Sequence, residues 1–401
     1  MRVSVRRKLA VFCIASLLAI LVAYKYAQRS TKSDKTIHSG GYRGLKRREM
    51  LRLPTNISSS KNVNDEPVAV IGGGGGVTEW NRSEPIVIFI NQFSAMDYIY
   101  DNSATRWEKE SPSCPTVRCR MTHNEIERET ADGLLLNRFV PLRFREQLKR
   151  YHDKQVVFVL NMEGEKEPEW RDPEITSKFD FKIGYSIKSD LPMLYGCGDF
   201  DGIDIIDSLI TRFEANQIKP PVNRHGLVAM ISNCMTVPND RLTVLRAMMK
   251  SLNVSSFGKC ENNMNVTQTR FLNPNWHQMK LDVFKNFKFG MAYESNNLEE
   301  YVTEKIYSCL HTGVIPIYHG APDIKTFVPG GSFINAADFK NTEELIQHIV
   351  SVDANPQLYA SYFKWDISAM KRLHELYCSV PVYCRWCEMV GRLRHEKRQR
   401  R

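Results

Sequence analysis

Short apolar runs recur along the chain from residue 85 onward, and they constrain the fold more than any other feature. The clearest runs are Ile86–Ile90, Leu134–Leu136, Val156–Leu160, Leu227–Ile231, Phe287–Tyr293 and Val314–Tyr318. Most are separated by segments with helical periodicity, such as Leu242–Leu252 after Asn239 and Thr342–Val352 after Asn341, where each asparagine is a candidate N-cap. Wholly apolar runs are typical of strands that are buried on both faces. Their alternation with helices predicts parallel α/β sheets.

The chain is long enough for two such sheets. The part of the chain from Pro85 onward, about 315 residues, exceeds what one comfortable core holds. We therefore expect two Rossmann-like α/β domains, residues 85–222 and 223–401, which face a cleft and meet near Gln217–Asn223. Ligands of such folds bind at the carboxyl ends of the strands and between the domains.

The N-terminus is basic and then apolar, which predicts a membrane anchor. Arg6-Arg7-Lys8 precedes the uncharged run Leu9–Tyr24, and no small-residue cleavage site follows the run. We therefore expect an uncleaved signal anchor over residues 9–25, a cytoplasmic tail over residues 1–8, and a single-pass type II protein with its C-terminal part in the lumen. The span is short, which suits the thinner membranes of the early secretory pathway.

Residues 26–84 are polar, basic and rich in glycine, and a segment of this composition cannot bury a core. We interpret it as a flexible, disordered stem. Of the 10 cysteines, Cys13 lies in the anchor, so an odd number remains for lumenal disulfides. One of them must stay unpaired or pair between chains. Candidate N-glycosylation sites are Asn56, Asn81, Asn253 and Asn265.

The net charge of +10 is concentrated in residues 1–50 and 392–401, and the part between them is acidic. A nucleic-acid-binding domain would carry its basic charge over the folded surface, so we exclude nucleic acid as a partner. A lumenal protein with two α/β domains suggests a glycosyltransferase, although a lumenal hydrolase or a lectin would have the same composition.

The segment from Phe287 to Gly320 contains Tyr301-Val-Thr-Glu-Lys305, with an aromatic–Glu pair before it and Gly-Val-Ile-Pro-Ile-Tyr-His-Gly after it. This pattern resembles the signature of the α1,3/4-fucosyltransferases, glycosyltransferase family 10, and the resemblance extends over residues 130–390. It implies a GT-B fold that transfers fucose from GDP-fucose with inversion. The donor would bind to residues 223–401 and the acceptor to residues 85–222.

The resemblance also assigns roles to single residues. Glu163 matches the general base that takes the proton of the acceptor hydroxyl. The positions that match donor-binding residues are Arg241, Tyr301, Glu304, Lys305 and Ser295. Ser295 is a departure, because the family usually has an asparagine there.

The resemblance implies that no metal cofactor is required, because Arg241 and Lys305 would offset the charge of the departing GDP. Stimulation by Mn²⁺ or Mg²⁺ stays open. Asp199-Phe-Asp201 has the Asp-x-Asp pattern of Mn²⁺-dependent transferases, but it lies in the acceptor-side half. The same resemblance implies that the pair Cys384 and Cys387 enters disulfides, with partners that the sequence does not identify.

Acceptor choice depends on Arg138 and Phe139, since an aromatic residue at this place is associated with α1,4 transfer and an arginine with α1,3 transfer. We expect a Golgi enzyme that fucosylates glycoprotein N-glycans, with α1,4 transfer to the GlcNAc of Galβ1,3GlcNAc to make Lewis a. The alternatives are core α1,3-fucosylation of N-glycans and an inactive, lectin-like relative.

Overall fold

The computed structural model describes residues 85–90, 114, 117–137, 150–164, 176–197, 204–235, 237–264 and 276–399. All of them belong to one compact unit, Val77–Arg401. Within these ranges, no helix is long and apolar enough to cross a membrane. The predicted features that lie outside the described residues are the tail, anchor and stem (residues 1–84), Asn56, Asn81, Arg138, Phe139, Asp199-Phe-Asp201 and Asn265.

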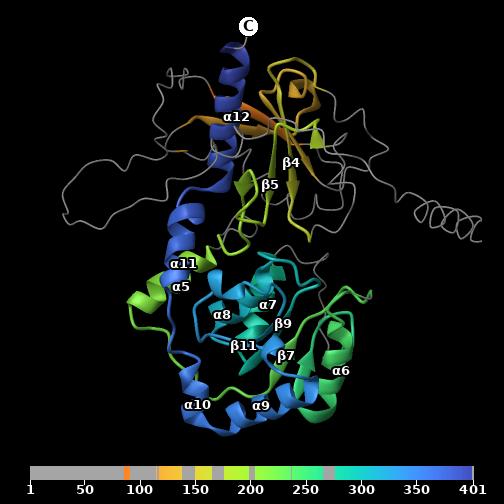
Figure 1. Ribbon diagram of the computed structural model, residues 1–401, viewed down its shortest axis with the longest axis vertical. Coiled ribbons are helices and arrows are strands. Elements are labelled where there is room, and N and C mark those ends of the chain that lie inside the picture. The colour runs from red at the N-terminus through yellow and green to blue at the C-terminus, as the bar shows by residue number, and fades with distance from the viewer. Residues whose placement is uncertain are drawn as a thin grey trace, which may run out of the picture. The chain divides into compact units, whose positions relative to one another are not determined.

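The first sheet is wholly parallel and follows the expected pattern of buried strands (Figure 1). Its strands are β1 (Ile86–Ile90), β2 (Cys119–Thr122), β3 (Gly133–Asn137), β4 (Val156–Asn161), β5 (Phe181–Gly184) and β6 (Leu191–Pro192). They lie in the order β2-β1-β3-β4-β5-β6, and every neighbouring pair is parallel.

The second sheet repeats this arrangement with later residues of the chain. Its strands are β7 (Leu227–Ala229), β8 (Val254–Ser256), β9 (Phe289–Tyr293), β10 (Ile315–His319) and β11 (Ile334–Asn335). They lie in the order β11-β10-β9-β7-β8 and are again all parallel. In both sheets the strand order reverses beside the first strand, and ligands of such sheets bind at the carboxyl ends next to this reversal. In the second sheet that place lies between β7 and β9.

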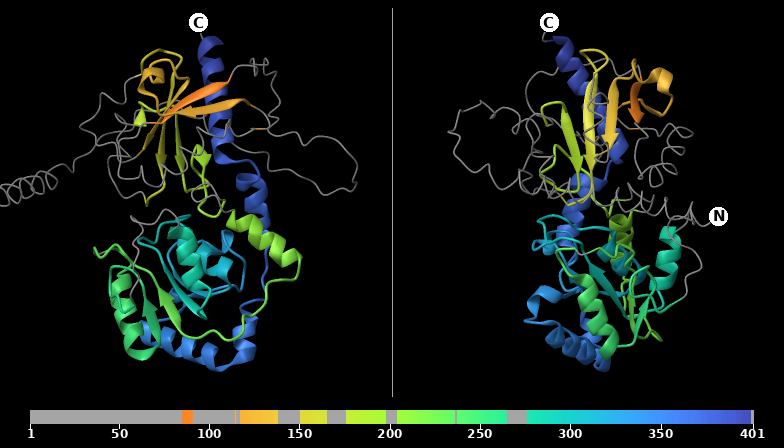
Figure 2. Two further views of the ribbon diagram at one scale, coloured as in Figure 1. Left: turned by 180° about the vertical axis from the view of Figure 1, so that it is seen from behind. Right: turned by 90° about the vertical axis from the view of Figure 1, so that its right-hand side faces the viewer.

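Helices cover both faces of the second sheet, as the two views of Figure 2 show. The α-helices are α5 (Ile205–Glu214), α6 (Arg241–Ser251), α7 (Trp276–Phe284), α8 (Glu304–Thr312), α9 (Thr342–Ala354), α10 (Pro356–Ser361), α11 (Ser368–Leu373) and α12 (Val382–Gln399). Ala292 of β9 faces the core that α5, α8 and α11 share, and its neighbour Met291 faces the core of α6 and α9. Because successive residues of a strand point to opposite faces, two covered faces require an apolar residue at every position. The prediction of parallel α/β sheets is confirmed.

The last helix, α12, packs on the first sheet rather than on the second. Trp386 and Val390 of α12 lie in one core cluster with Ile88 of β1 and Phe158 of β4. Residues 382–399 of the predicted donor domain therefore complete the core around the preceding sheet. The division of the chain at residue 222 stays a prediction.

The N-cap prediction holds for one of the two helices. Asn341 caps α9, since its side-chain oxygen accepts a hydrogen bond from the Glu344 N–H at 2.9 Å. For α6 the prediction was wrong, because the N-cap residue is Asp240, with a left-handed φ of 38°. The Asn239 side chain instead donates to the backbone oxygen of Glu294 at 3.0 Å, so a tertiary contact prevails over the local cap.

Among the described residues, four disulfides join separate parts of the chain: Cys114–Cys384, Cys119–Cys387, Cys197–Cys378 and Cys234–Cys260. The prediction that Cys384 and Cys387 enter disulfides is confirmed, and both bonds attach α12 beside β2. Among the cysteines that the structure describes, Cys309 is free, and burial raises the pKa of its thiol to about 12.

Candidate active site

Glu294 lies at the centre of a buried polar cluster where β9 ends. Its side chain is 0% exposed, and its carboxylate accepts hydrogen bonds from both the N–H and the hydroxyl of Thr303, at 2.8 and 2.7 Å. Its Oε2 also pairs with Lys305 Nζ at 3.0 Å. Gly320 leaves room for this carboxylate, since a Cβ there would lie 2.6 Å from Glu294 Cγ. Burial raises the pKa of Glu294, and the charge of Lys305 opposes that shift.

Lys305 belongs to the first turn of α8 and is 24% exposed. Its ammonium lies 3.6 Å from Glu304 Oε1 and donates to the Thr303 hydroxyl at 2.6 Å. Burial by itself would lower the pKa of Lys305, but the carboxylates of Glu294 and Glu304 outweigh burial and raise it. Lys305 is therefore a held cation rather than a mobile surface lysine.

Thr303 is the N-cap residue of α8, but its hydroxyl does not cap the helix. The hydroxyl is engaged by Glu294 instead. The helix α8 begins at Glu304. The first turn of α8 thus presents its positive dipole end beside Lys305, a combination that favours anions.

Arg241 opens α6 and is 6% exposed, so it is not a solvated surface arginine. Its Nη2 donates to the Asn233 carbonyl oxygen at 3.2 Å, while its buried Nε has no hydrogen-bond partner in the part of the chain that the structure describes. Burial lowers the pKa of Arg241, and the negative charges of Glu294, Glu304 and Glu163 oppose that shift. The guanidinium therefore lies in the field of the same acidic cluster.

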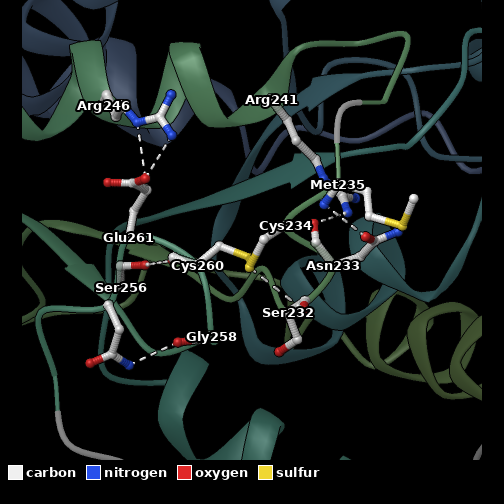
Figure 3. The surroundings of a disulfide bond; sticks show 11 residues. Ser232, Asn233, Cys234, Met235, Arg241, Arg246, Ser256, Gly258, Cys260 and Glu261 are labelled. Atoms are coloured by element: carbon white, nitrogen blue, oxygen red, sulfur yellow. Dashed lines mark hydrogen bonds and ion pairs between the residues drawn. A yellow bond between two sulfur atoms is a disulfide. The ribbon is translucent and has the colours of Figure 1, made fainter. Parts of the chain in front are cut away.

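A disulfide holds the loop that contacts Arg241 (Figure 3). Cys234 follows Asn233 directly and is bonded to Cys260, in the loop after β8. The N–H of Cys260 donates to the Ile231 carbonyl oxygen at 2.9 Å, so the two loops are also joined through their backbones. The carbonyl group that accepts from Arg241 is thus fixed by a covalent neighbour.

Glu163 and Tyr301 connect the two sheets. Glu163 follows β4 of the first sheet and is half-buried, and its Oε2 accepts a hydrogen bond from the Tyr301 hydroxyl at 3.1 Å. The Tyr301 ring packs edge-on against Tyr185, with 4.9 Å between the ring centroids. Burial, followed by the charges of Glu163 and Glu294, raises the pKa of Tyr301 far above its ordinary value, so its hydroxyl keeps its proton and donates a hydrogen bond to Glu163.

The structure thus brings the predicted positions Glu163, Arg241, Tyr301, Glu304 and Lys305 into one region at the carboxyl ends of both sheets. The Tyr301 side chain also has a hydrogen bond with Ser295, so that position belongs to the region too. Asn253, the candidate glycosylation site among the described residues, is exposed at the start of β8.

Two residues of the cluster were not predicted, Glu294 and Asn239. Glu294 stands in the aromatic–Glu pair that ends β9, next to the strand-order reversal, and that position was the available signal. Asn239 is 7% exposed and its Oδ1 has no hydrogen-bond partner among the described residues. The sequence offers a reason to regard it as a helix cap and none to place it against Glu294.

The described residues contain no group of three or more His, Cys, Asp or Glu side chains that could hold a metal ion. Among the described residues, the cations in the field of the acidic cluster include Arg241, Lys305 and the buried Lys280. The arrangement can bind an anion at the start of α8. The carboxylate of Glu163, which follows a strand of the first sheet, can accept a proton there.

Two doubly wound parallel sheets with polar residues at their carboxyl ends form an α/β fold similar to that of GT-B fucosyltransferases. The family described as "Glycosyltransferase family 10 (fucosyltransferase) C-term" matches residues 222–401. This match agrees with the family that the sequence motifs suggested.

Relatives with similar sequences carry fucosyltransferase names. The chain is 33% identical over 201 residues to the "GDP-fucose protein O-fucosyltransferase 3" of Homo sapiens, which covers 48% of this chain and 40% of the relative. It is 25% identical over 290 residues to the "Alpha-(1,4)-fucosyltransferase" of Arabidopsis thaliana, covering 69% of this chain and 66% of the relative. The chain thus spans less than half of the human relative and about two thirds of the plant one.

A solved structure titled "Crystal Structure of alpha1,3-Fucosyltransferase" superposes with a TM-score of 0.52. The sequences are 16% identical, and the superposition covers 71% of this chain and 83% of the other. This likeness concerns the fold alone.

Proposed function

We propose that the protein is a fucosyltransferase that moves L-fucose from GDP-fucose, with inversion, to the GlcNAc of glycoprotein glycans. The observation that carries the proposal is the hydrogen bond from Tyr301 to Glu163, which joins the predicted base to the cluster around Glu294 and Lys305. An inverting sugar transfer needs a base that takes the proton of the acceptor hydroxyl and positive charge that stabilises the leaving group. Here the base would follow a strand of the first sheet, and the cations belong to helices of the second.

In the proposed reaction the acceptor oxygen attacks C1 of fucose from the face opposite GDP. The new C–O bond forms as the bond from C1 to the β-phosphate oxygen breaks, and Glu163 takes the hydroxyl proton. A neutral hydroxyl is a weak nucleophile, so removal of its proton during attack lowers the barrier. The Tyr301 hydroxyl holds the carboxylate in one orientation.

The negative charge that develops on GDP needs a partner in the transition state. Arg241 and Lys305 supply fixed positive charge, and the first turn of α8 adds N–H groups. Glu294 and Thr303 hold Lys305 in place before the substrate arrives. These groups would do the work of a metal ion, so we propose that none is required, and that Mn²⁺ or Mg²⁺ act at most as stimulants.

For the acceptor we propose Galβ1,3GlcNAc with α1,4 linkage, which makes Lewis a. The support is the Phe139 position and the likeness to the plant α1,4-fucosyltransferase. We further propose a single-pass type II protein of the Golgi membrane, anchored by residues 9–25. A protein hydroxyl is a second candidate acceptor, which the likeness to the protein O-fucosyltransferases favours.

The test uses the full-length chain, expressed in cells without endogenous fucosyltransferases, and labelled GDP-fucose. The acceptors are Galβ1,3GlcNAc, Galβ1,4GlcNAc, an N-glycan core and a folded domain with exposed serine and threonine. We expect fucose transfer to Galβ1,3GlcNAc. In Glu163→Gln we expect kcat to fall at least about 100-fold, because the general base is lost. Glu343→Gln, an exposed change in α9, is the matched control.

Transfer to another acceptor would replace the proposed linkage and keep the class of enzyme. An active Glu163→Gln variant would remove Glu163 from the mechanism. GDP binding with no transfer to any acceptor would favour the lectin-like alternative.

A further inference from the structure

Glu300 has a backbone conformation that side chains other than glycine seldom adopt. Its φ is 64°, in the left-handed region, although the residue is 4% exposed and immediately precedes Tyr301. Such a conformation costs about 1–3 kcal/mol and persists only where surrounding contacts hold it. The contacts around Glu300 therefore indicate what the strained turn is for.

The carboxylate of Glu300 is held from the first sheet. It accepts a hydrogen bond from the Ser186 hydroxyl and lies 3.3 Å from Lys188 Nζ. Ser186 and Lys188 both belong to the turn between β5 and β6. The Lys188 N–H in turn donates to the Ser186 hydroxyl oxygen at 3.0 Å, so this turn is ordered around the carboxylate.

The backbone of Glu300 is held from the second sheet. Its N–H donates to Asp323 Oδ1 at 2.9 Å, in the segment that follows β10. One residue is thus bonded through its side chain to the first sheet and through its backbone to the second. Both bonds constrain the same φ and ψ angles.

Tyr301 depends on this turn for its position. Its ring meets Tyr185, the residue before Ser186, and its hydroxyl reaches Glu163. Consecutive residues of one loop, Glu300 and Tyr301, therefore contact consecutive residues of the other, Ser186 and Tyr185. A change of the backbone angles at residue 300 would swing the Tyr301 side chain away from both of its partners.

We propose that Glu300 is a positioning residue, whose carboxylate, held by Ser186 and Lys188, fixes the left-handed turn that places the Tyr301 hydroxyl on Glu163. The effect of this turn on turnover rests on the proposed function, since it takes Glu163 as the base. The turn itself does not depend on that function.

Glu299 offers a matched control. It also pairs with Lys188, at 2.9 Å, but its side chain is 69% exposed. An exposed ion pair of this kind contributes little to stability. Glu299 shares the contact with Lys188 but lacks the hydrogen bond with Ser186. Glu299→Gln therefore removes the same charge, one residue away, and leaves the turn unchanged.

The experiment compares the full-length wild type with Glu300→Gln, Glu300→Gly and Glu299→Gln, in transfer kinetics and in hydrogen exchange of the segment 298–306. We expect Glu300→Gln to lower kcat about 10-fold and to leave KM for GDP-fucose within about twofold, which corresponds to lost transition-state stabilisation. The amides of residues 301–303 should exchange faster, while peptides of β7 and α9 stay as in the wild type.

Glu300→Gly separates strain from contact, because glycine adopts a positive φ without cost. We expect it to lower kcat as much as Glu300→Gln does, and Glu299→Gln to match the wild type. The proposal would be overturned if Glu300→Gln had the kcat and the hydrogen-exchange rates of the wild type. It would also be overturned if Glu299→Gln lowered kcat as much as Glu300→Gln does. If the wild type transfers no fucose, the proposed function fails, and the exchange data still decide whether Glu300 fixes the turn.

Discussion

The pair between Glu294 and Lys305 permits a quantitative prediction, because its two members differ in burial. Glu294 is fully buried, whereas Lys305 is 24% exposed and has Glu304 as a second partner at 3.6 Å. Removal of one partner from a buried ion pair costs about 3–5 kcal/mol, since the other charge stays behind without compensation. The cost should therefore depend on which charge is left.

We expect Lys305→Met to cost about 4 kcal/mol, because it leaves a buried carboxylate without its ion-pair partner and with the hydrogen bonds from Thr303. Glu294→Gln should cost about 2 kcal/mol, because Lys305 keeps Glu304 and some contact with water. The double variant removes both members of the buried pair and leaves Glu304, which is 26% exposed, without Lys305; it should cost about 2 kcal/mol, well below the sum of the single changes.

The assay is thermal unfolding followed by circular dichroism, where each kcal/mol corresponds to a shift in Tm of about 2–4 °C. The control is Lys340→Met, which breaks an exposed pair with Glu344 on α9 and should leave Tm unchanged. Additive effects in the double variant, or a larger loss in Glu294→Gln than in Lys305→Met, would refute the reasoning. The deficit of Lys305→Met should also shrink as the pH falls, since a protonated Glu294 needs no counter-charge.

Two further predictions concern other parts of the fold. Cys234→Ser opens a loop of 26 residues, worth about 3.5 kcal/mol in the chain-entropy account, and frees the Asn233 carbonyl that orients Arg241. KM for GDP-fucose should rise more than kcat falls, and an unchanged KM would show that the disulfide does not serve Arg241. Hydrogen bonds from Arg120 and then Thr122 lower the pKa of Glu127 from 4.5 to about 2. Since the folded-state pKa is the lower one, this stabilisation is present above pH 4.5 and is lost as the pH falls toward 2. Glu127→Gln should therefore lower Tm at neutral pH and converge with the wild type in acid; curves that stay parallel would contradict this.

The local sequence pattern was sufficient to predict the named strands and one of the two helix caps. The run Ile86–Ile90 coincides with β1, and Val156–Leu160 lies within β4, because strands buried on both faces must be apolar at each position. Asn341 was predicted as a cap from its neighbours alone and is one. Asn239 has the same local signal, yet a contact with Glu294, 55 residues away in the chain, decides its role.

In the candidate site, too, some residues could be predicted from the local sequence and others could not. The motif around Tyr301 indicated the family and several donor positions, since these residues are contiguous and their order is visible in the sequence. Glu294 was passed over because its importance lies in what surrounds it: Thr303, Lys305 and the space beside Gly320. Burial of a carboxylate is a property of the packed chain.

By itself, the sequence indicated the class of fold, the family that residues 222–401 match and the odd number of cysteines after the predicted anchor, because each follows from composition, spacing or a contiguous motif. Only the tertiary structure decided that α12 returns to the first sheet, that Cys384 and Cys387 bond to Cys114 and Cys119, and that Glu300 holds a strained turn between Ser186 and Asp323. The physical reason is that each of these features depends on residues far apart in the chain. Their proximity is set by how whole elements pack, and no local preference of either partner records it.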